Sequence, residues 1–362
     1  MPDRLVLLTG FPGFIGRRLV SRLLAADPEV RIVALVERQA RGAATEAAGE
    51  IDGERIEILV GDIAERRLGL SDEDYERLRA ETTDAYHLAA LYNLAVPIEV
   101  AQRVNVEGTG NVLELCAGCE RLERLNYVST AYVAGLRRGV VYEHELSLGQ
   151  RFGNHYESTK FQAELWVQGA MNRVPVTVYR PAIVVGDSRS GETRKFDGPY
   201  YMLRVIARSV RAGVPIPQFG RSGAPFNVVP VDFVVDALAA CGTDPGSVGE
   251  TLHLVDPDPI TAAELLALLA HEYADKELGP RVPAGIVAES LRLKVVRDLF
   301  AGAPRESIRY LNHPVRFDTR RAEKVLGPLG LRCPPVREYV EPMVSFFRAH
   351  EHDPALRPAN TL

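Results

Sequence analysis

The chain has 362 residues, of which 46% are hydrophobic and 25% are charged, and its formal net charge is −5. This composition excludes a disordered chain and fits one large α/β unit or two modest domains with ample length for a core. The mildly acidic balance gives no bulk attraction to nucleic acid or to an anionic membrane. The N-terminal apolar run is too short for a signal segment or a membrane span, so we expect a cytoplasmic protein.

Strand-like and helix-like segments alternate through the first half of the chain. Short, continuous apolar runs predict buried strands at residues 4–10, 31–36, 55–62, 84–90, 124–130 and 174–181. Helical patterns predict helices at 14–28, at 71–80 behind a capping-box variant of Ser71 and Asp74, at 104–119 and around Tyr156. This alternation predicts the α/β class, with a doubly wound parallel sheet.

Three glycines follow the first expected strand directly. Gly10, Gly13 and Gly16 have the spacing GxxGxxG and stand where the first helix begins. Glycines allow a tight turn and let a pyrophosphate approach the helix N-terminus, where free N–H groups favour an anion. A purely structural turn would show the same glycines, but their place in the first βαβ unit predicts a Rossmann-type dinucleotide-binding domain.

The side chain that reads the adenine-side ribose is expected about 20 residues further on, after the second strand. Glu37 and Arg38 stand there. A carboxylate accepts hydrogen bonds from a ribose 2′-hydroxyl and repels a 2′-phosphate, whereas an Arg binds the phosphate. We expect NADP(H) rather than NAD(H), on the hypothesis that Glu37 points away and that Arg38 lies on the adenine–phosphate side. After the third strand, Asp62 stands where an adenine could be contacted, unless it only caps a turn.

The chain has four cysteines, of which Cys116 and Cys119 form a CxxC. They stand late in an apolar helical run, with no second CxxC and no nearby His. We therefore expect two buried helical thiols rather than a metal or redox site. His144 and His155 also lack a partner at metal-ligand spacing, so no metal is expected.

The stretch "GNHYESTKFQAELW" places Tyr156 four residues before Lys160. Residues at i and i+4 share one helical face. A phenol beside an ammonium indicates proton chemistry, because the ammonium favours the phenolate, although a buried Tyr with a snorkelling Lys is the alternative. Lowering the phenol pKa by about 3 units corresponds to roughly 4 kcal/mol of phenolate stabilisation.

After Pro181 the pattern changes to a stretch rich in Gly, Pro and Arg. Helices are expected at 200–213, 229–242 and 262–273, a strand at 251–256, a capping box of Thr261 and Glu264, and mainly helices over 280–350. We expect a dinucleotide-binding domain of residues 1–186, to which 226–256 return, and a smaller, mainly helical substrate lobe of 187–225 and 257–362.

Several segments together resemble the extended short-chain dehydrogenase/reductase superfamily. They are, in the family's order over about residues 5–190, "TGFPGFIG", "GDI", "YHLAA", "VNVEGTGNVL", "YVSTAYVAG", "YESTK" and "YRPAIVVG". "FNVVPVDFVVDAL" and "TLHLVDPDPIT" extend the resemblance loosely to about 270. The sequences of these motifs are most similar to the thioester-reductase and fatty-acyl-CoA-reductase branch, of the male-sterility type. The chain departs from that branch at Glu37, where Arg is usual, and in its C-terminal helices.

The resemblance implies a catalytic set of Thr130, Tyr156 and Lys160. Thr130 would be an oxyanion-type donor, or only a strand-end cap, and Lys160 would also hold the nicotinamide ribose. His87 is expected to be structural. The cofactor contacts implied are Gly10, Phe11, Gly13, Phe14, Ile15, Gly16, Glu37, Arg38, Asp62, Ile63, Ala89, Ala90, Asn105, Tyr156, Lys160, Pro181, Ala182 and Ile183.

We therefore expect an NAD(P)-dependent oxidoreductase that reduces a carbonyl or an acyl thioester. Its small-molecule substrate could be linked to CoA or to a carrier protein, and the chain could form a homodimer. A sugar-nucleotide epimerase or dehydratase, a hydroxysteroid-type alcohol dehydrogenase and a silent dinucleotide sensor are the alternatives. The stretch after Gly186 would be a lid over an apolar chain. Its cations would bind a phosphorylated handle or form a solvated mixed face with nearby carboxylates; they are Arg189, Arg194, Lys195, Arg204, Arg208 and Arg211.

Overall fold

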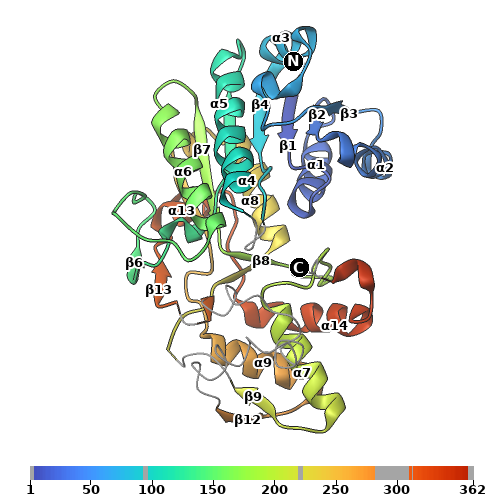
Figure 1. The fold of residues 1–362 in the computed structure, drawn as a ribbon, viewed down its shortest axis with the longest axis vertical. Coiled ribbons are helices and arrows are strands. Elements are labelled where there is room, and N and C mark those ends of the chain that lie inside the picture. The colour runs from blue at the N-terminus through green and yellow to red at the C-terminus, as the bar shows by residue number, and fades with distance from the viewer. Residues whose placement is uncertain (1–3, 93–96, 219–222, 282–309, 312, 358–362) are drawn as a thin grey trace.

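The computed structural model describes residues 4–92, 97–218, 223–281, 310–311 and 313–357. Its centre is a seven-stranded sheet in the order β11-β7-β5-β4-β1-β2-β3, with every pairing parallel (Figure 1). The strands are β1 (Leu5–Thr9), β2 (Arg31–Val36), β3 (Ile56–Val60), β4 (Thr82–His87), β5 (Arg124–Val128), β7 (Val176–Pro181) and β11 (Thr251–Leu254). The doubly wound parallel sheet is thus confirmed. Its order reverses between β1 and β4, which is where such folds bind ligands.

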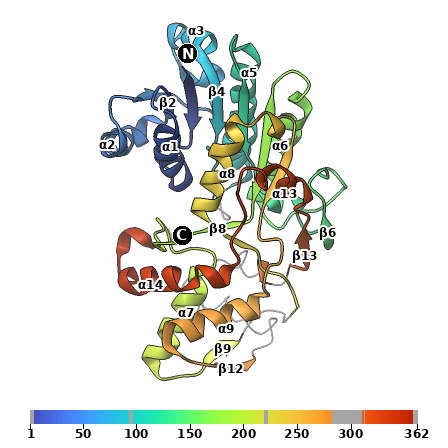
Figure 2. The ribbon, with the colours of Figure 1, turned by 180° about the vertical axis from the view of Figure 1, so that it is seen from behind.

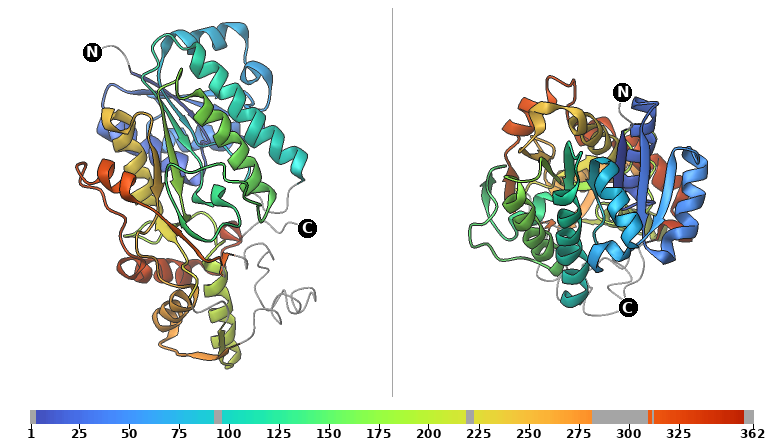
Figure 3. Two further views of the ribbon diagram at one scale, coloured as in Figure 1. Left: turned by 90° about the vertical axis from the view of Figure 1, so that its left-hand side faces the viewer. Right: turned by 90° about the horizontal axis from the view of Figure 1, so that it is seen from above.

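Helices cover both faces of the sheet (Figure 3). One face packs on α1 (Phe14–Ala26), α2 (Arg41–Ile51) and α8 (Val231–Thr243), and the other on α3 (Asp72–Glu81), α5 (Gly108–Gly118) and α6 (His155–Ala170). Alternate residues of β1 serve the two cores: Val6 and Leu8 enter the first, whereas Leu5 and Leu7 enter the second. This alternation explains the continuous apolar runs, because a strand buried on both faces needs apolar residues at every position.

The expected helix at 104–119 is confirmed as part of a longer one. It starts with α4 (Ile98–Gln102), passes through a π-helical segment, η3 (Arg103–Glu107), and continues as α5. The expected caps are present as well. Ser71 Oγ accepts a hydrogen bond from Asp74 N, and Thr261 and Glu264 form a complete capping box in front of α9 (Ala262–Ala274). Such caps satisfy free N–H groups of a helix start.

A second, mainly helical layer lies below the carboxyl ends of the strands (Figure 1). It consists of α7 (Tyr200–Ala212), α9 and α14 (Val340–His350), with the short strand pair β9 (Ile216–Gln218) and β12 (Leu278–Arg281). Its own hydrophobic cluster contains Leu203, Leu265 and Phe347. The strand pair β8 (Ile183–Val185) and β10 (Val228–Pro230) lies where the two halves meet (Figure 2).

The chain then returns to the sheet. β13 (Val315–Phe317) pairs with β6 (Gly139–Val141), and α13 (Arg320–Leu326) follows. Val315, Phe317, Ala322 and Leu326 pack into the core of the dinucleotide-binding half, although they fall within the expected substrate lobe. The two-lobe division itself stays a prediction, and expected helices within 282–309 lie outside the described residues.

The 3₁₀ turns are η1 (Arg38–Ala40), η2 (Arg66–Gly69), η4 (Ala131–Ala134), η5 (Pro245–Ser247), η6 (Val336–Glu338) and η7 (Pro354–Leu356).

Candidate active site

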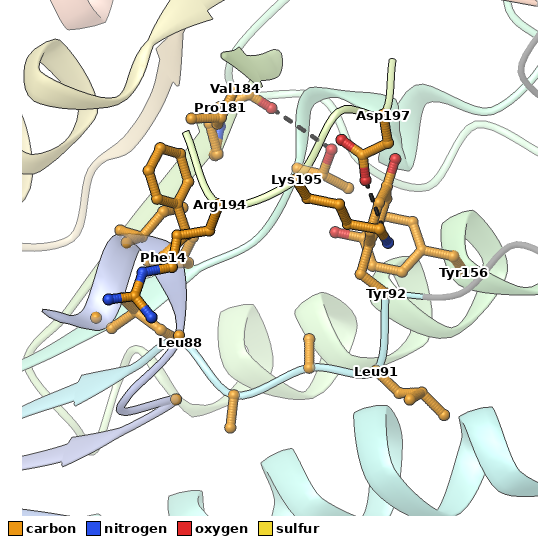
Figure 4. A pocket seen from close by; sticks show the side chains of 18 of the residues that line it. Phe14, Leu88, Leu91, Tyr92, Tyr156, Pro181, Val184, Arg194, Lys195 and Asp197 are labelled. Carbon is orange, nitrogen blue, oxygen red and sulfur yellow. Dashed lines mark hydrogen bonds and ion pairs between the residues drawn. The ribbon is translucent and has the colours of Figure 1, made fainter. Parts of the chain in front are cut away.

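A cavity of about 710 Å³ lies between the carboxyl ends of the strands and the helical layer. The glycine turn lines one end of it, and apolar side chains of the helical layer line the other. Figure 4 shows Phe14 and Arg194 toward one side of the close-up, and Tyr92, Tyr156 and Asp197 toward the other. This is the position at which the fold class predicts a ligand.

The glycine turn has no room for side chains. Gly10 has φ +91°, and a Cβ there would lie 2.9 Å from Ala89 N. A Cβ on Gly13 or on Gly16 would lie 2.7 or 2.5 Å from Gly10 O. The helix α1 begins directly behind the turn without a side-chain cap, so its first N–H groups are available to an anion. This cradle fits the pyrophosphate of a dinucleotide.

Most of the residues that the resemblance implied are brought together around the cavity. Those that line it are Gly10, Phe11, Gly13, Phe14, Ile15, Gly16, Glu37, Ile63, Ala89, Ala90, Thr130, Tyr156, Lys160, Pro181, Ala182 and Ile183. Arg38, Asp62 and Asn105 are not among the lining residues. The roles of all these residues stay predictions. The surroundings of Arg38, Asp62 and Asn105 explain why these three do not line the cavity.

Glu37 and Arg38 differ in their relation to the cavity. Glu37 follows β2 and lines the cavity, whereas Arg38 begins the turn η1 and is exposed outside it. The reason is the direction of the chain, which leaves the sheet at Glu37 and turns away at once through η1. The roles expected of these two residues in the choice of cofactor stay predictions.

Asp62 and Asn105 are engaged in local structure. Asp62 Oδ1 accepts a hydrogen bond from Ala64 N at 2.8 Å, which is the turn-capping role left open above. Asn105 is buried, accepts from Leu91 N at 2.7 Å and donates to Thr159 Oγ1 at 3.0 Å. It thereby ties the loop after β4 to α6, and so fixes the lining of the cavity from behind.

Tyr156 and Lys160 share one face of α6, as expected, but the amine is directed elsewhere. Lys160 Nζ donates to Tyr127 Oη at 3.0 Å and to Val128 O at 2.8 Å on β5. Burial raises the pKa of Tyr156, with Glu157 adding to the effect, and burial lowers the pKa of Lys160 to about 7. The expected lowering of the Tyr156 pKa is not found in this structure, because burial raises that pKa and the Lys160 amine is bonded to β5.

The two hydroxyls after β5 have different surroundings. Thr130 Oγ1 accepts from Tyr132 N at 3.3 Å, donates to Pro181 O at the long distance of 3.5 Å, and faces the cavity. The Thr130 hydroxyl therefore caps the turn after β5 and also stands where it could donate a hydrogen bond into the cavity. Ser129 Oγ instead donates to Glu164 Oε2 at 2.5 Å, so it is held by a buried carboxylate.

Glu164 belongs to a buried ion pair behind β5. Arg180 Nη2 contacts Glu164 Oε1 at 2.6 Å, and both side chains are almost fully buried. Buried charges are tolerated when they are paired and hydrogen-bonded. No sequence pattern marks this pair, because each residue alone looks like an ordinary charge within a strand or a helix.

His87 is structural, in line with its expected role. It is buried between Thr9 Oγ1, at 2.7 Å from Nδ1, and Thr109 Oγ1, at 3.0 Å from Nε2, and burial lowers its pKa to about 3. Within the described ranges no group of His, Cys, Asp and Glu could hold a metal ion. Cys116 is a buried free thiol, and Cys119 is a half-buried free thiol at the end of α5.

Several cavity residues were not expected from the sequence. The edge of the Tyr92 ring meets Tyr156, with centroids 5.0 Å apart and planes at 88°. The place of Tyr92 just after a central parallel strand could have indicated it. The far end is lined by Tyr201, Met202, Val205, Phe226 and Leu311, which were not predicted as site residues.

The segment after Gly186 lies over the cavity and is tied to the first domain. Arg18 on α1 pairs with Asp187 at 3.0 Å and with Glu192 at 2.9 Å. Of its cations, Arg194 and Lys195 line the cavity, and Lys195 pairs with Asp197 at 3.3 Å (Figure 4). The cavity therefore contains a mixed-charge rim and not an all-basic one.

The parallel sheet, the glycine cradle and the Tyr–Lys helix define an extended short-chain dehydrogenase/reductase, close to its thioester-reductase branch. A family model described as "Male sterility protein" matches residues 8–238. The chain therefore belongs to the Male sterility protein family.

Relatives and solved structures agree with this family. The chain is 29% identical over 277 residues to nonribosomal peptide synthetase asaC of Aspergillus flavus, covering 70% of this chain and 26% of that protein. It is 28% identical over 373 residues to aldehyde reductase lnaA of the same organism, covering 91% and 34%. The crystal structure of the terminal R domain from the myxalamid PKS-NRPS pathway superposes with a TM-score of 0.81 and 28% identity, covering 98% and 93% of the two chains.

Two further findings concern the coverage of the relatives and the possibility of a membrane-spanning helix. The chain spans at most 26% of the length of three curated relatives that it matches, so it corresponds to one part of those proteins. In the part of the chain that the structure describes, no helix has both the length and the apolar character needed to cross a bilayer.

Proposed function

We propose that the chain is an NAD(P)H-dependent reductase of acyl thioesters and of the aldehydes derived from them. The observation that carries the proposal is a single cavity with three successive zones. The glycine cradle fits a pyrophosphate, Thr130 and Tyr156 supply hydroxyls between the two ends, and apolar side chains of the helical layer line the far end. An apolar end suits an acyl chain better than a nucleotide diphosphate.

The comparisons support this substrate class. The similar terminal R domain belongs to a PKS-NRPS pathway, and another relative is called an aldehyde reductase. A substrate carried as a thioester on CoA or on a carrier protein agrees with these relatives. The charged pair Lys195 and Asp197, with Arg194 beside it, would meet the polar handle of such a thioester at the rim.

A reduced nicotinamide held by the glycine cradle and Lys160 would supply hydride to the carbonyl carbon of the substrate. The carbonyl oxygen then becomes an oxyanion, and Thr130 is suited to stabilise it, because its long hydrogen bond to Pro181 O can be exchanged for one to the substrate. Tyr156 stays protonated because burial raises its pKa, so it is an acid that can give a proton to the oxygen. Breaking the C–S bond of the hemithioacetal would release aldehyde and thiol, with the hydroxyl proton passing to the sulfur. Exchange of the oxidised cofactor for a second reduced one, with a second proton, would then give the alcohol.

Lys160 has two parts in this proposal. Its pKa of about 7 makes the ammonium a suitable source of the proton that Tyr156 loses. Lys160 also lines the cavity, and its amine would exchange an acceptor on β5 for the hydroxyls of the nicotinamide ribose that it is expected to hold. Pro181, Ala182 and Ile183 would lie along the nicotinamide.

The test is the oxidation of reduced cofactor by the purified chain with a panel of substrates. We expect consumption with acyl-CoA, with a carrier-bound acyl thioester or with fatty aldehyde, and none with steroid ketones or UDP-sugars. Turnover of a nucleotide sugar without net loss of cofactor would instead establish an epimerase. Cofactor binding without any turnover across the panel would favour a dinucleotide sensor.

A further inference from the structure

The end of the cavity beside the glycine turn is built from the ends of three neighbouring strands. β1 and β2 pair in a register that puts Thr9 opposite Leu35, and β2 and β3 pair with Val36 opposite Val60. Glu37, directly after β2, therefore stands alongside the turn that follows β1. Residues on both sides of Glu37 also line this end of the cavity; they are Leu35, Val36, Ala40, Gly61 and Ile63. This is the side of the fold on which the adenine-side ribose of a dinucleotide lies.

Glu37 offers a carboxylate with an acceptor oxygen at this place. Its Oε2 accepts a hydrogen bond from Gln39 Nε2 at 2.5 Å. Over the described ranges, Oε1 has no hydrogen-bond donor and the carboxylate has no ion-pair partner within 4.0 Å. An exposed carboxylate of this kind accepts hydrogen bonds from a ribose 2′-hydroxyl, whereas a 2′-phosphate would bring about two further negative charges beside it.

The neighbouring cations do not neutralise Glu37. Arg38 and Arg41 are exposed and do not line the cavity. On α1, Arg17 pairs with Glu50, and Arg18 pairs with carboxylates of the segment over the cavity. A 2′-phosphate at this end would therefore meet a carboxylate before any arginine.

We propose that Glu37 makes this chain select NAD(H) over NADP(H), given the dinucleotide site of the proposed function. This selection differs from the NADP(H) lean drawn from the sequence, because that lean required Glu37 to point away from the cofactor. It also gives a physical reason for Glu37 at a position where the thioester-reductase branch usually has Arg.

The experiment is a titration of the purified chain with NADH and with NADPH, without substrate, followed by nicotinamide fluorescence or calorimetry. We expect the Kd for NADH to be at least tenfold lower than the Kd for NADPH. In Glu37→Gln, which keeps the size of the side chain and removes its charge, the Kd for NADPH should fall about tenfold, and that for NADH should rise slightly.

Two control variants separate this contact from general charge effects. Glu46→Gln removes one negative charge from an exposed position on α2 outside the cavity, and should leave the ratio of the two Kd values unchanged. Arg38→Ala should change both Kd values by less than about twofold. A lower Kd for NADPH in the unmodified chain, or an unchanged ratio in Glu37→Gln, would overturn the selection by Glu37. Absence of binding for both dinucleotides would overturn the proposed function with it.

Discussion

Lys160 lies one helical turn after Tyr156, yet its amine donates to Tyr127 and to the carbonyl of Val128 on β5. The phenol is left in a buried site that raises its pKa. For reduction this is a suitable state, since an acid must keep its proton until the oxyanion forms. At the scale of single residues, the protonation of the pair therefore depends on burial and on β5 as much as on the i, i+4 spacing.

The phenol proton can be tested with Tyr156→Phe, which removes the hydroxyl and keeps the ring. We expect kcat to fall by about 10²- to 10⁴-fold, the usual contribution of a general acid, with cofactor Kd within about twofold. Steady-state kinetics and cofactor titration measure the two quantities. Tyr75→Phe, at a buried tyrosine in the core below α3 and α5, is the matched control and should keep full turnover. Normal kcat in Tyr156→Phe would contradict the proposed acid.

The contact between Lys160 and Tyr127 predicts a shift in the pH profile. Deprotonation of Lys160 as the pH rises through about 7 should lower kcat, since the ammonium is the proposed proton source. Tyr127→Phe removes one of the two acceptors of the ammonium, which disfavours the charged form and should move this limb of the profile to lower pH. A merely structural role for Tyr127 would lower kcat equally at all pH values, so the position of the limb decides between them.

At the scale of elements, the periodicity and order of the apolar segments predicted the strands of the central sheet. All seven strands of the central sheet were expected, because strands buried on both faces are continuous apolar runs. The site residues at the strand ends and on α6 were implied by the family resemblance, and most of them line the cavity. The helix α2 was missed, since it buries only alanines, Ala44, Ala47 and Ala48, and shows no strong apolar stripe. Strands of three residues, such as β8 and β13, are too short to show an alternating period.

The directions of individual side chains were beyond the sequence. Whether Glu37 faces the cavity, and whether Lys160 contacts Tyr156 or β5, depends on the turn η1 and on the packing of α6 against the sheet. The sequence placed the Lys160 ammonium beside the Tyr156 phenol, whereas its amine donates to Tyr127 and Val128 on β5. Spacing places two residues on one face, but tertiary contacts decide which partner each side chain reaches.

The glycine turn gives a prediction at the scale of elements. In Gly16→Ala the new Cβ would lie 2.5 Å from Gly10 O, a backbone atom that cannot move without opening the turn. We expect the cofactor Kd to rise at least tenfold and the melting temperature to fall. Gly49→Ala on α2, where a Cβ meets nothing within 4 Å, is the control and should be neutral or stabilising by up to about 1 kcal/mol. Equal effects of the two substitutions would show that the turn is not sterically constrained.

For the whole molecule, the two halves share one cavity and are joined by charged contacts. Arg18 on α1 holds two carboxylates of the segment after Gly186, and Val315 and Phe317 return from the C-terminal part to the core of the sheet. The two ends of the cavity therefore belong to one connected body. The homodimer expected from the sequence stays a prediction that solution mass measurements would test.

Acid stability is a property of the whole molecule that two buried histidines should control. Burial lowers the pKa of His87 and of His253 to about 3, and Arg180 adds to the effect at His253. Between about pH 6.5 and 3 the unfolded chain binds protons that the folded chain does not, so the free energy of unfolding must fall as the pH decreases in this window. Each histidine contributes a slope of up to about 1.4 kcal/mol per pH unit.

The contribution of His253 can be isolated with His253→Asn. His253 Nδ1 donates to Asp318 O at 2.7 Å, and Nε2 lies 3.2 Å from Arg180 Nη1, so protonation would set two cations against each other. The Asn amide can replace the donor to Asp318 O but does not titrate. Urea unfolding between pH 4 and 6.5 should therefore give a smaller pH slope for His253→Asn, whatever its absolute stability, while His144→Asn at an exposed position keeps the slope of the unmodified chain. Parallel pH curves for His253→Asn and the unmodified chain would mean that His253 is not held neutral by the fold.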